Sequence, residues 1–446
     1  MPPAVAAPWR LPGFWADIRP QVWSALGLSP AVYADEAFFA DEQTRLFGRA
    51  WTGVALADEL SRPGRLLVRS VAGKSVLLTR SGSQLRGFMN TCRHRGTELA
   101  EADCDIAGII RCPYHRWSYS TDGRLVAAPL FEASPPSDFD PADWRLVAVR
   151  VDTWGPIVFV CLDEETPPLD VWLGDLPERL AGYRLEGWQL ADLDGATAKF
   201  DVAANWKLLV ENFAEYYHLP WVHPKLAKVS RVKDHYRYQG PGMYCGQTTT
   251  PVSSDQHEDW AVLPPATGLG ASDAASGRFV AVFPNVLLAV LPNHVFLVLL
   301  EPLSVGRTIE HCTFLFPPGA APSPEDEEGR QRLAEAFETT RRFWIDVNDE
   351  DIDICERVQR GVSRAGAPPG PMAPRFEEPL NRFHNMTADL MTLGSVADLE
   401  VPMGDRPGDV DLYGTKPNPM PPPIEAEAAR LGAPADVDGT TAPALG

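Results

Sequence analysis

The sequence lacks any unbroken run of about eighteen apolar residues, which is the minimum for a typical membrane-spanning helix. Its longest apolar region, residues 279–300, is interrupted by prolines, asparagines and a histidine, so it predicts strand-length pieces instead. The N-terminal residues have no basic segment followed by an apolar one, which predicts that no signal peptide is present. We therefore expect a cytoplasmic protein that does not bind a membrane.

Basic residues are also scarce, since 40 Lys and Arg stand against 60 Asp and Glu and give a net charge of −20. Such a surface repels phosphate, so nucleic acid is not an expected partner. The seven cysteines are an odd number in a chain of 446 residues, which argues against a disulfide framework. A glycine-rich nicotinamide-binding turn is absent as well, so the chain is not expected to bind a nicotinamide cofactor itself.

The order of patterns along the chain predicts several structural segments. Residues 1–49 are expected to be helical in parts, and short strands with tight turns are expected from Gly64 to about Leu162. Further on, residues 205–218 predict a helix that ends before Pro220, and 279–317 predict three strands. A long polar helix is expected over 324–360. The Pro- and Ala-rich end, 416–446, is expected to be disordered.

The strongest chemical signal comes from two short segments, each of which contains one cysteine and one histidine. They are separated by seventeen residues and read Cys92-Arg93-His94 and Cys112-Pro113-Tyr114-His115. Two such loops can place both thiolates on one iron of a [2Fe–2S] cluster and both imidazoles on the other. A structural zinc site is the alternative, but its usual spacing pairs Cys with Cys and His with His. The alternation of residue types therefore favours the iron–sulfur cluster.

The segment ENFAEYYHLPWVHP predicts a second metal site. On the expected helix, Glu211, Glu215 and His218 fall on one stripe, and polar groups on a core-facing stripe are costly unless they are bonded or bind a metal. Pro220 would end the helix and turn His223 back toward His218. Two histidines and one carboxylate form the facial triad of Fe(II) enzymes that activate O₂.

The carboxylate of this triad must come from elsewhere in the chain. The candidate segment is WIDVNDEDIDICERVQRG, which offers Asp346, Asp349, Glu350, Asp351 and Asp353 as candidates. Spacing does not choose among these five, and a solvated acidic helix is the expected setting for most of them.

These motifs, with NTCRHRGTEL and CPYHRWSY around the first site, resemble those of the catalytic subunits of Rieske non-haem iron oxygenases. The resemblance covers about residues 35–395. It implies that Cys92, His94, Cys112 and His115 bind the cluster, and that His218 and His223 bind a mononuclear Fe(II). In that family the ligand Asp stands shortly before a Gln, which implies Asp351 ahead of Gln359 and leaves Glu350 as the second choice.

The resemblance implies further roles. Glu215, three residues before the first ligand histidine, would connect the cluster ligand His115 of one subunit to His218 of the next in a homotrimer, and Asn212 would also belong to the catalytic site. The short ENFxExYH form looks like the branch that acts on quaternary ammonium compounds such as choline, glycine betaine, carnitine and proline betaine. Arg116 departs from the family, which usually has glycine after the second cluster histidine.

The expected fold class is α+β. A β-rich Rieske domain, 50–165, would be inserted into a helix-grip-like catalytic domain of antiparallel sheet and helices, formed by 1–49 and 166–415. The expected function is that of an oxygenase component, which uses O₂ and electrons from a separate NAD(P)H-dependent reductase to hydroxylate or N-dealkylate a small molecule. The alternatives are the alpha subunit of an aromatic-ring dioxygenase and a Rieske electron carrier without enzymatic activity.

Overall fold

The computed structural model describes residues 7–131, 136, 138–230, 235–249, 263–365 and 368–399. The chain divides into two compact units, one formed by Gln43–Leu169 and the other by Met1–Glu42 with Asp170–Gly446. The predicted Rieske span falls inside the first unit, and the predicted tail, 416–446, lies outside the described residues. In the described part of the chain, no helix has both the length and the apolar character needed to cross a membrane.

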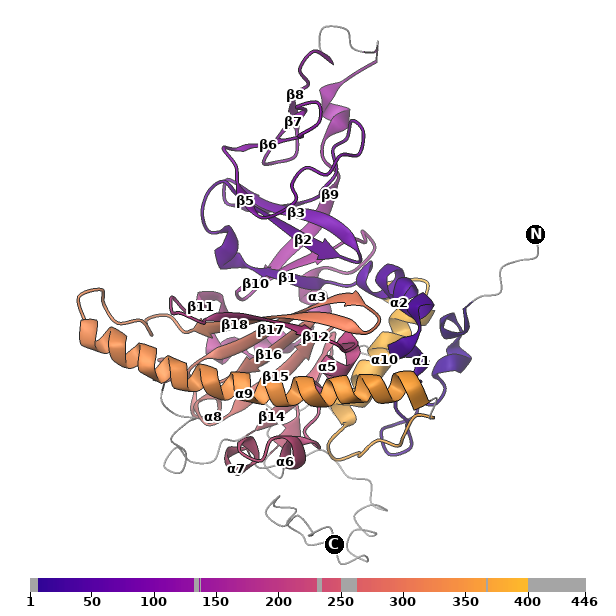
Figure 1. Ribbon diagram of the computed structural model, residues 1–446, viewed down its shortest axis with the longest axis vertical. Coiled ribbons are helices and arrows are strands. Elements are labelled where there is room, and N and C mark those ends of the chain that lie inside the picture. Colours follow the sequence, from indigo (N-terminus) through magenta and orange to yellow (C-terminus); the bar gives the residue numbers. More distant parts are fainter. Residues whose placement is uncertain are drawn as a thin grey trace, which may run out of the picture. The chain divides into compact units, whose positions relative to one another are not determined.

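The Gln43–Leu169 unit is built on a seven-stranded antiparallel sheet with the order β1-β10-β9-β4-β3-β2-β5 (Figure 1). Its strands are β1 (Thr52–Leu56), β2 (Arg65–Val71), β3 (Lys74–Ser81), β4 (Gln84–Met89), β5 (Cys104–Asp105), β9 (Ala148–Trp154) and β10 (Ile157–Cys161). Ala72 and Gly73 connect β2 to β3 with positive φ at both residues, which is the two-residue turn that matches the twist of a hairpin.

A second, three-stranded sheet in the same unit has the order β6-β7-β8. Its strands are β6 (Ile109–Arg111), β7 (Ser118–Ser120) and β8 (Leu125–Ala127). Buried side chains from both sheets, including Phe88 and Tyr119, form one apolar cluster together with the two thiols Cys92 and Cys112. The cysteine-bearing loops are therefore anchored in a packed core.

The other unit contains an eight-stranded antiparallel sheet with the order β11-β18-β17-β16-β15-β14-β13, to which β12 is added by pairing with β18. Its strands are β11 (Gln189–Leu190), β12 (Thr197–Val202), β13 (His235–Arg237), β14 (Tyr244–Thr249), β15 (Gly277–Val282), β16 (Val286–Val290), β17 (Val295–Ser304) and β18 (Arg307–Phe316). The sequence predicted three strands within 279–317, and the structure has four. The turn between Ser304 and Arg307 was missed because its residues, Val305 and Gly306, lack the Pro-Asn composition of the two turns before it.

Helices cover this sheet, and the expected antiparallel α+β architecture is confirmed. The α-helices among the described residues are α1 (Ala31–Ala34), α2 (Glu36–Glu42), α3 (Leu169–Leu173), α4 (Leu176–Arg179), α5 (Trp206–Ala214), α6 (Leu219–Val222), α7 (Leu226–Val229), α8 (Ala271–Ala274), α9 (Glu327–Ala365) and α10 (Glu378–Thr392). The long helix predicted over 324–360 is α9, which runs along the sheet in Figure 1.

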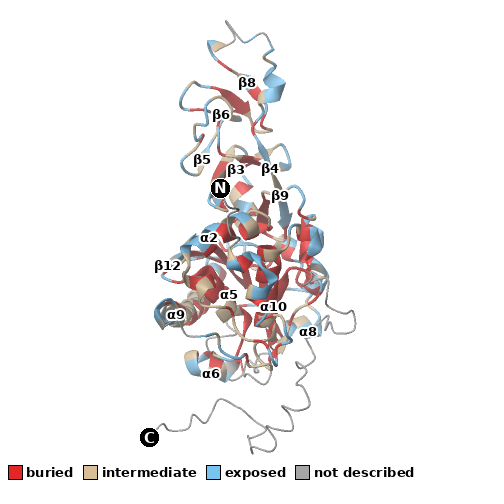
Figure 2. Cartoon of the chain, turned by 90° about the vertical axis from the view of Figure 1, so that its right-hand side faces the viewer, coloured by how far each residue is buried: buried red, intermediate tan, exposed pale blue. Residues whose placement is uncertain are grey.

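Helix α5 lies at the centre of this arrangement. It contacts α9 and α10 as well as β14, β15 and β17. Figure 2 shows that α5, α10 and the strands carry most of the buried residues, while α9 keeps one face exposed. Side chains of α5 are therefore held between α9 and the sheet, which is where the second predicted metal site begins.

Candidate metal centres

The two loops that carry the Cys and His pairs have closely similar backbones. In the first, the Gly96 N–H donates to the Cys92 carbonyl at 3.0 Å and the Cys92 N–H donates to the Thr97 carbonyl at 2.8 Å. In the second, the Cys112 N–H donates to the Trp117 carbonyl at 2.8 Å. Each loop is thus closed as a tight turn behind its cysteine, which fixes where the thiol points.

Arg116 has the backbone conformation that the turn requires. It follows Cys112 by four residues, as Gly96 follows Cys92, and the φ angles of Arg116 and Gly96 are 60° and 72°. A residue with a side chain costs about 1 kcal/mol more than glycine in this left-handed region. The departure from the family pattern at Arg116 therefore adds a side chain and some strain, and the turn itself is unchanged.

The four predicted cluster ligands converge. Rings of His94 and His115 lie with their centroids 4.7 Å apart, and the Cys92 and Cys112 thiols are both buried. Among the described residues the buried Nδ1 of His94 has no hydrogen-bond partner. A buried ring nitrogen without a partner is expected where it binds a metal. Two thiols and two imidazoles in this arrangement fit a [2Fe–2S] cluster of the Rieske type.

Two aromatic residues support this donor set. The Trp117 ring stacks on His94 at 4.8 Å with an interplanar angle of 10°, which holds the imidazole plane. The Tyr119 hydroxyl lies 3.3 Å from Cys92 Sγ and accepts a hydrogen bond from the Arg93 N–H at 3.1 Å. A hydrogen bond to a ligand sulfur is one of the means by which a protein raises the reduction potential of a cluster.

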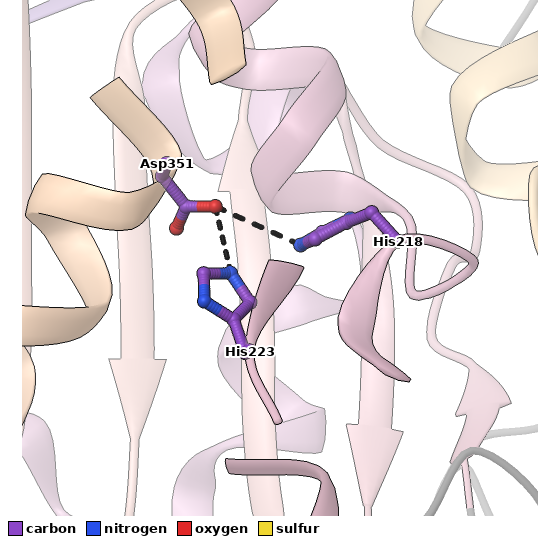
Figure 3. Close-up of side chains that lie close together, drawn as sticks. All are labelled: His218, His223 and Asp351. Carbon is purple, nitrogen blue, oxygen red and sulfur yellow. Dashed lines mark hydrogen bonds and ion pairs between the residues drawn. The ribbon is translucent and has the colours of Figure 1, made fainter. Parts of the chain in front are cut away.

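The predicted mononuclear site is assembled from two separate segments, as Figure 3 shows. Asp351 Oδ1 lies 2.8 Å from His223 Nε2 and 3.7 Å from His218 Nε2. One ligand atom from each of these three residues lies within 4.8 Å of the other two. The donor set is that of the facial triad, so the three side chains fit a mononuclear Fe(II).

The helix predicted over 205–218 is wrong in its last four residues. Helix α5 begins after the N-cap Asn205, whose side chain accepts from the Lys207 N–H, and it ends at Ala214. Glu215 has an extended backbone with ψ 169°, so Glu215 and His218 do not continue the stripe of Glu211. His218 and His223 flank the one-turn helix α6 instead, and their ring centroids are 5.1 Å apart.

The early end of α5 is produced by contacts from distant segments. Gln247 on β14 donates its side-chain N–H to the Glu215 carbonyl at 2.9 Å. Tyr216 is fully buried, stacks on His235 and donates its hydroxyl to the Arg375 carbonyl at 2.7 Å. These contacts replace helical hydrogen bonds, so Pro220 is not the residue that ends the helix and lies in the first turn of α6.

Each of the two triad histidines has a carboxylate on its other ring nitrogen. Glu215 binds His218 Nδ1 through a short hydrogen bond, and Glu350 Oε2 lies 2.7 Å from His223 Nδ1. Burial disfavours a charge on His218, but Glu215 and Asp351 hold its pKa above the ordinary value. A carboxylate at Nδ1 keeps the proton there and leaves Nε2 free to bind a metal.

This geometry separates Glu350 from Asp351. Glu350 is on the Nδ1 side of His223, whereas Asp351 faces Nε2 of both histidines, so the arrangement favours Asp351 as the metal ligand. Asp346 and Asp353 form exposed ion pairs with Lys225 and Arg357. Asp349 is not part of the group of converging ligand atoms.

A small cavity adjoins Asp351, and the predicted site residue Asn212 lines it. The same cavity is lined by Glu310, a buried residue of β18 that the sequence analysis missed. The alternation of residues along this strand already sets Glu310 apart. It is the one charged member of a set that shares one face of the strand with Thr308, Cys312, Phe314 and Phe316.

The two units match two families of known proteins. Residues 50–142 match the Rieske [2Fe–2S] domain, and residues 191–393 match the ring hydroxylating alpha subunit (catalytic domain). The glycine betaine monooxygenase oxygenase subunit of Pseudomonas aeruginosa (strain UCBPP-PA14) is 25% identical over 388 residues, which is 79% of this chain and 86% of the relative.

Two further proteins are similar. The N,N-dimethyl phenylurea N-demethylase subunit alpha of Sphingobium sp. (strain YBL2) is 37% identical over 202 residues, which is 44% of each chain. The solved structure of a quaternary ammonium Rieske monooxygenase, described for carnitine oxidation and electron transfer between subunits, superposes with a TM-score of 0.69 at 25% identity. That superposition covers 86% of this chain and 99% of the other.

Proposed function

Because this chain joins a Rieske [2Fe–2S] domain to the catalytic domain of ring-hydroxylating alpha subunits, and is thus the oxygenase component of a Rieske system, we propose that it hydroxylates or N-dealkylates a small alkylated amine. The observation that carries the proposal is the convergence of His218, His223 and Asp351 beside a cavity in a chain that also has the four cluster donors. When bound, the cluster supplies single electrons and the mononuclear iron activates O₂.

The side chains of the chain have distinct tasks in this proposal. Cys92, His94, Cys112 and His115 would hold the cluster, and His218, His223 and Asp351 would hold the iron. Glu215 and Glu350 keep a proton on Nδ1 of their histidines, so that both rings present Nε2 to the metal. Asn212 lines the cavity in which a substrate would be placed.

An amine substrate is supported by two independent points. The matched relatives include enzymes named for glycine betaine and for N-demethylation of a dimethyl phenylurea. The cavity is also lined by Phe213, Phe296 and Trp344, and aromatic faces attract alkylammonium groups. An aromatic-ring dioxygenase is the second candidate, since the catalytic domain matches the ring-hydroxylating alpha subunits.

The proposal includes partners and assembly. Electrons would come from a separate NAD(P)H-dependent reductase, and the chain would act as a cytoplasmic homotrimer. In this ring, Glu215 would connect His218 to the cluster ligand His115 of a neighbouring copy. Glu215 suits that task because its carboxylate is largely buried and is bonded to His218 Nδ1.

The test combines metal analysis with coupled turnover. The purified protein is expected to contain three irons for two acid-labile sulfides and to show a Rieske-type EPR signal after reduction. With a surrogate reductase and NADH, O₂ uptake should be stoichiometric with product for at least one betaine, choline, carnitine or tertiary amine. Uncoupled NADH oxidation with every amine, together with a stoichiometric hydroxylated product from an arene, would establish the ring dioxygenase instead. Two irons per chain would indicate an electron carrier.

A further inference from the structure

Glu310 occupies a position on the sheet where a charge is unexpected. It lies on β18, with Leu300 of β17 as its neighbour across the strands, and its exposure is 4%. The following residues on the same face, Cys312 and Phe314, are opposite Val298 and Phe296. Burying a carboxylate among such side chains is costly unless a proton, a cation or hydrogen bonds compensate for the lost hydration.

The partners of Glu310 within the chain compensate for this cost only in part. Asn348 on α9 donates its side-chain N–H to Glu310 Oε2 at 2.9 Å. Among the described residues that line the cavity there is no lysine or arginine. Burial raises the pKa of Glu310 to about 7, with Asn348 opposing the shift and the carboxylates of Asp351 and Asp349 adding to it. A positive group that enters the cavity would therefore stabilise the charged carboxylate.

The cavity also provides the surfaces that a cationic head group needs. Phe296 and Trp344 are stacked with their centroids 5.2 Å apart, and Phe213 of α5 contributes another ring to the lining. Asp351 lines the same cavity, one helical turn after Asn348 on α9. A ligand beside Glu310 would consequently be next to the metal triad and in contact with aromatic side chains.

We propose that Glu310 is a specificity-determining residue that recognises the positive charge of an alkylammonium substrate in this cavity. The inference rests on the proposed function and deepens it, because it assigns the preference for a cation to one carboxylate in addition to the aromatic rings. The rings attract a cation and also accept an uncharged apolar group of suitable shape, whereas the carboxylate favours only the charged one. Asn348 acts as a positioning residue that orients Oε2 of Glu310.

The experiment compares each cation with its carbon isostere, in which the quaternary nitrogen is replaced by carbon. Binding of choline and of its isostere 3,3-dimethylbutan-1-ol is measured by calorimetry on the metal-loaded holoenzyme without reductase. The wild type should prefer a cation by on the order of tenfold to a hundredfold, as expected for a partly buried charge pair. Glu310→Gln should remove most of this preference and leave affinity for the isostere unchanged, and Glu310→Asp should retain part of it.

The matched control is Glu301→Gln on the neighbouring strand β17, where the carboxylate is partly exposed and pairs with His311 at 2.9 Å. This variant should keep the wild-type preference, and all variants should keep the cluster absorbance and the ratio of iron to sulfide. Absence of cation binding by the wild type, or an unchanged preference in Glu310→Gln, overturns the inference. Cation binding that depends on Glu310, without O₂-dependent product, overturns the proposed function and leaves the inference intact.

Discussion

At the residue scale, the proposed iron site has two neighbouring carboxylates that make different contacts. Glu350 and Asp351 are adjacent on α9, yet one reaches Nδ1 of His223 and the other reaches Nε2. The side chains of consecutive helical residues diverge by roughly 100° around the axis, so His223 can lie between them. Adjacent residues of α9 are therefore suited to different tasks: Asp351 to binding the metal, and Glu350 to orienting His223.

This difference predicts that two alanine variants differ in how much mononuclear iron they retain. Asp351→Ala should lose the mononuclear iron and keep the cluster, because the triad then has only two ligands. Glu350→Ala should retain iron with an affinity lowered by about ten- to a hundredfold, the usual effect of removing a carboxylate from a ligating histidine. Iron and acid-labile sulfide are measured on both proteins during dialysis against a chelator. Full activity in Asp351→Ala combined with iron loss in Glu350→Ala would reverse the two assignments.

At the scale of elements, the decisive feature is the break between α5 and α6. The carboxylate of Glu215 accepts from the N–H groups of Tyr217 and His218, so it satisfies the backbone of the unwound segment as well as the histidine ring. The break places His218 and His223 at the two ends of α6. A continuous helix would have separated the two rings, because residues five positions apart do not share a face.

The position of Glu215 at this break predicts the effect of Glu215→Gln. The amide keeps the length of the side chain and one acceptor oxygen, so both metal centres should remain and the cluster should be reduced normally. Electron transfer to the mononuclear iron should slow by orders of magnitude in single-turnover experiments, because the amide cannot replace the charged link to His218. Glu350→Gln, the same change at the other histidine, serves as the control and should transfer electrons at nearly the wild-type rate. Wild-type transfer in Glu215→Gln would remove Glu215 from the electron path.

At the scale of the whole molecule, the two sets of metal donors lie in different compact units of the chain. The proposed cluster donors belong to Gln43–Leu169, and the proposed iron ligands belong to the unit that contains Asp170–Gly446. An electron must therefore pass between units, either within one chain or between copies. We propose the second route, in a homotrimer.

Mixing two inactive variants distinguishes these routes. Cys92→Ala should lose the cluster and Asp351→Ala the iron, so each is inactive alone. When the two variants are co-expressed in equal amounts, they should assemble at random into mixed rings. If each cluster serves one neighbour, an intact iron meets an intact cluster at one interface in four. The mixed rings should then recover about a quarter of the wild-type activity. The measurement is coupled turnover of the purified mixed oligomer, with its mass determined by light scattering. Absence of any recovery in verified mixed trimers would place the electron path within one chain.

Several features of this protein were determined by the sequence alone. The alternating Cys and His pairs predicted the cluster because ligand types at short spacing depend little on the rest of the fold. The antiparallel sheet followed from short apolar runs separated by turn residues, and the long helix α9 followed from a polar helical pattern over many residues. The histidines proposed for the second centre were selected for the same reason as the cluster residues, since both lie in one short segment.

Features that depend on contacts between residues far apart in the chain were decided only by the tertiary structure. The end of α5 at Ala214 is set by Gln247 and by the burial of Tyr216, and neither contact can be seen in the local sequence. The choice between Asp351 and Glu350 required the position of His223 relative to α9. Glu310 became a candidate only when the sheet and α9 enclosed it beside Asp351, because burial and proximity are properties of the folded chain.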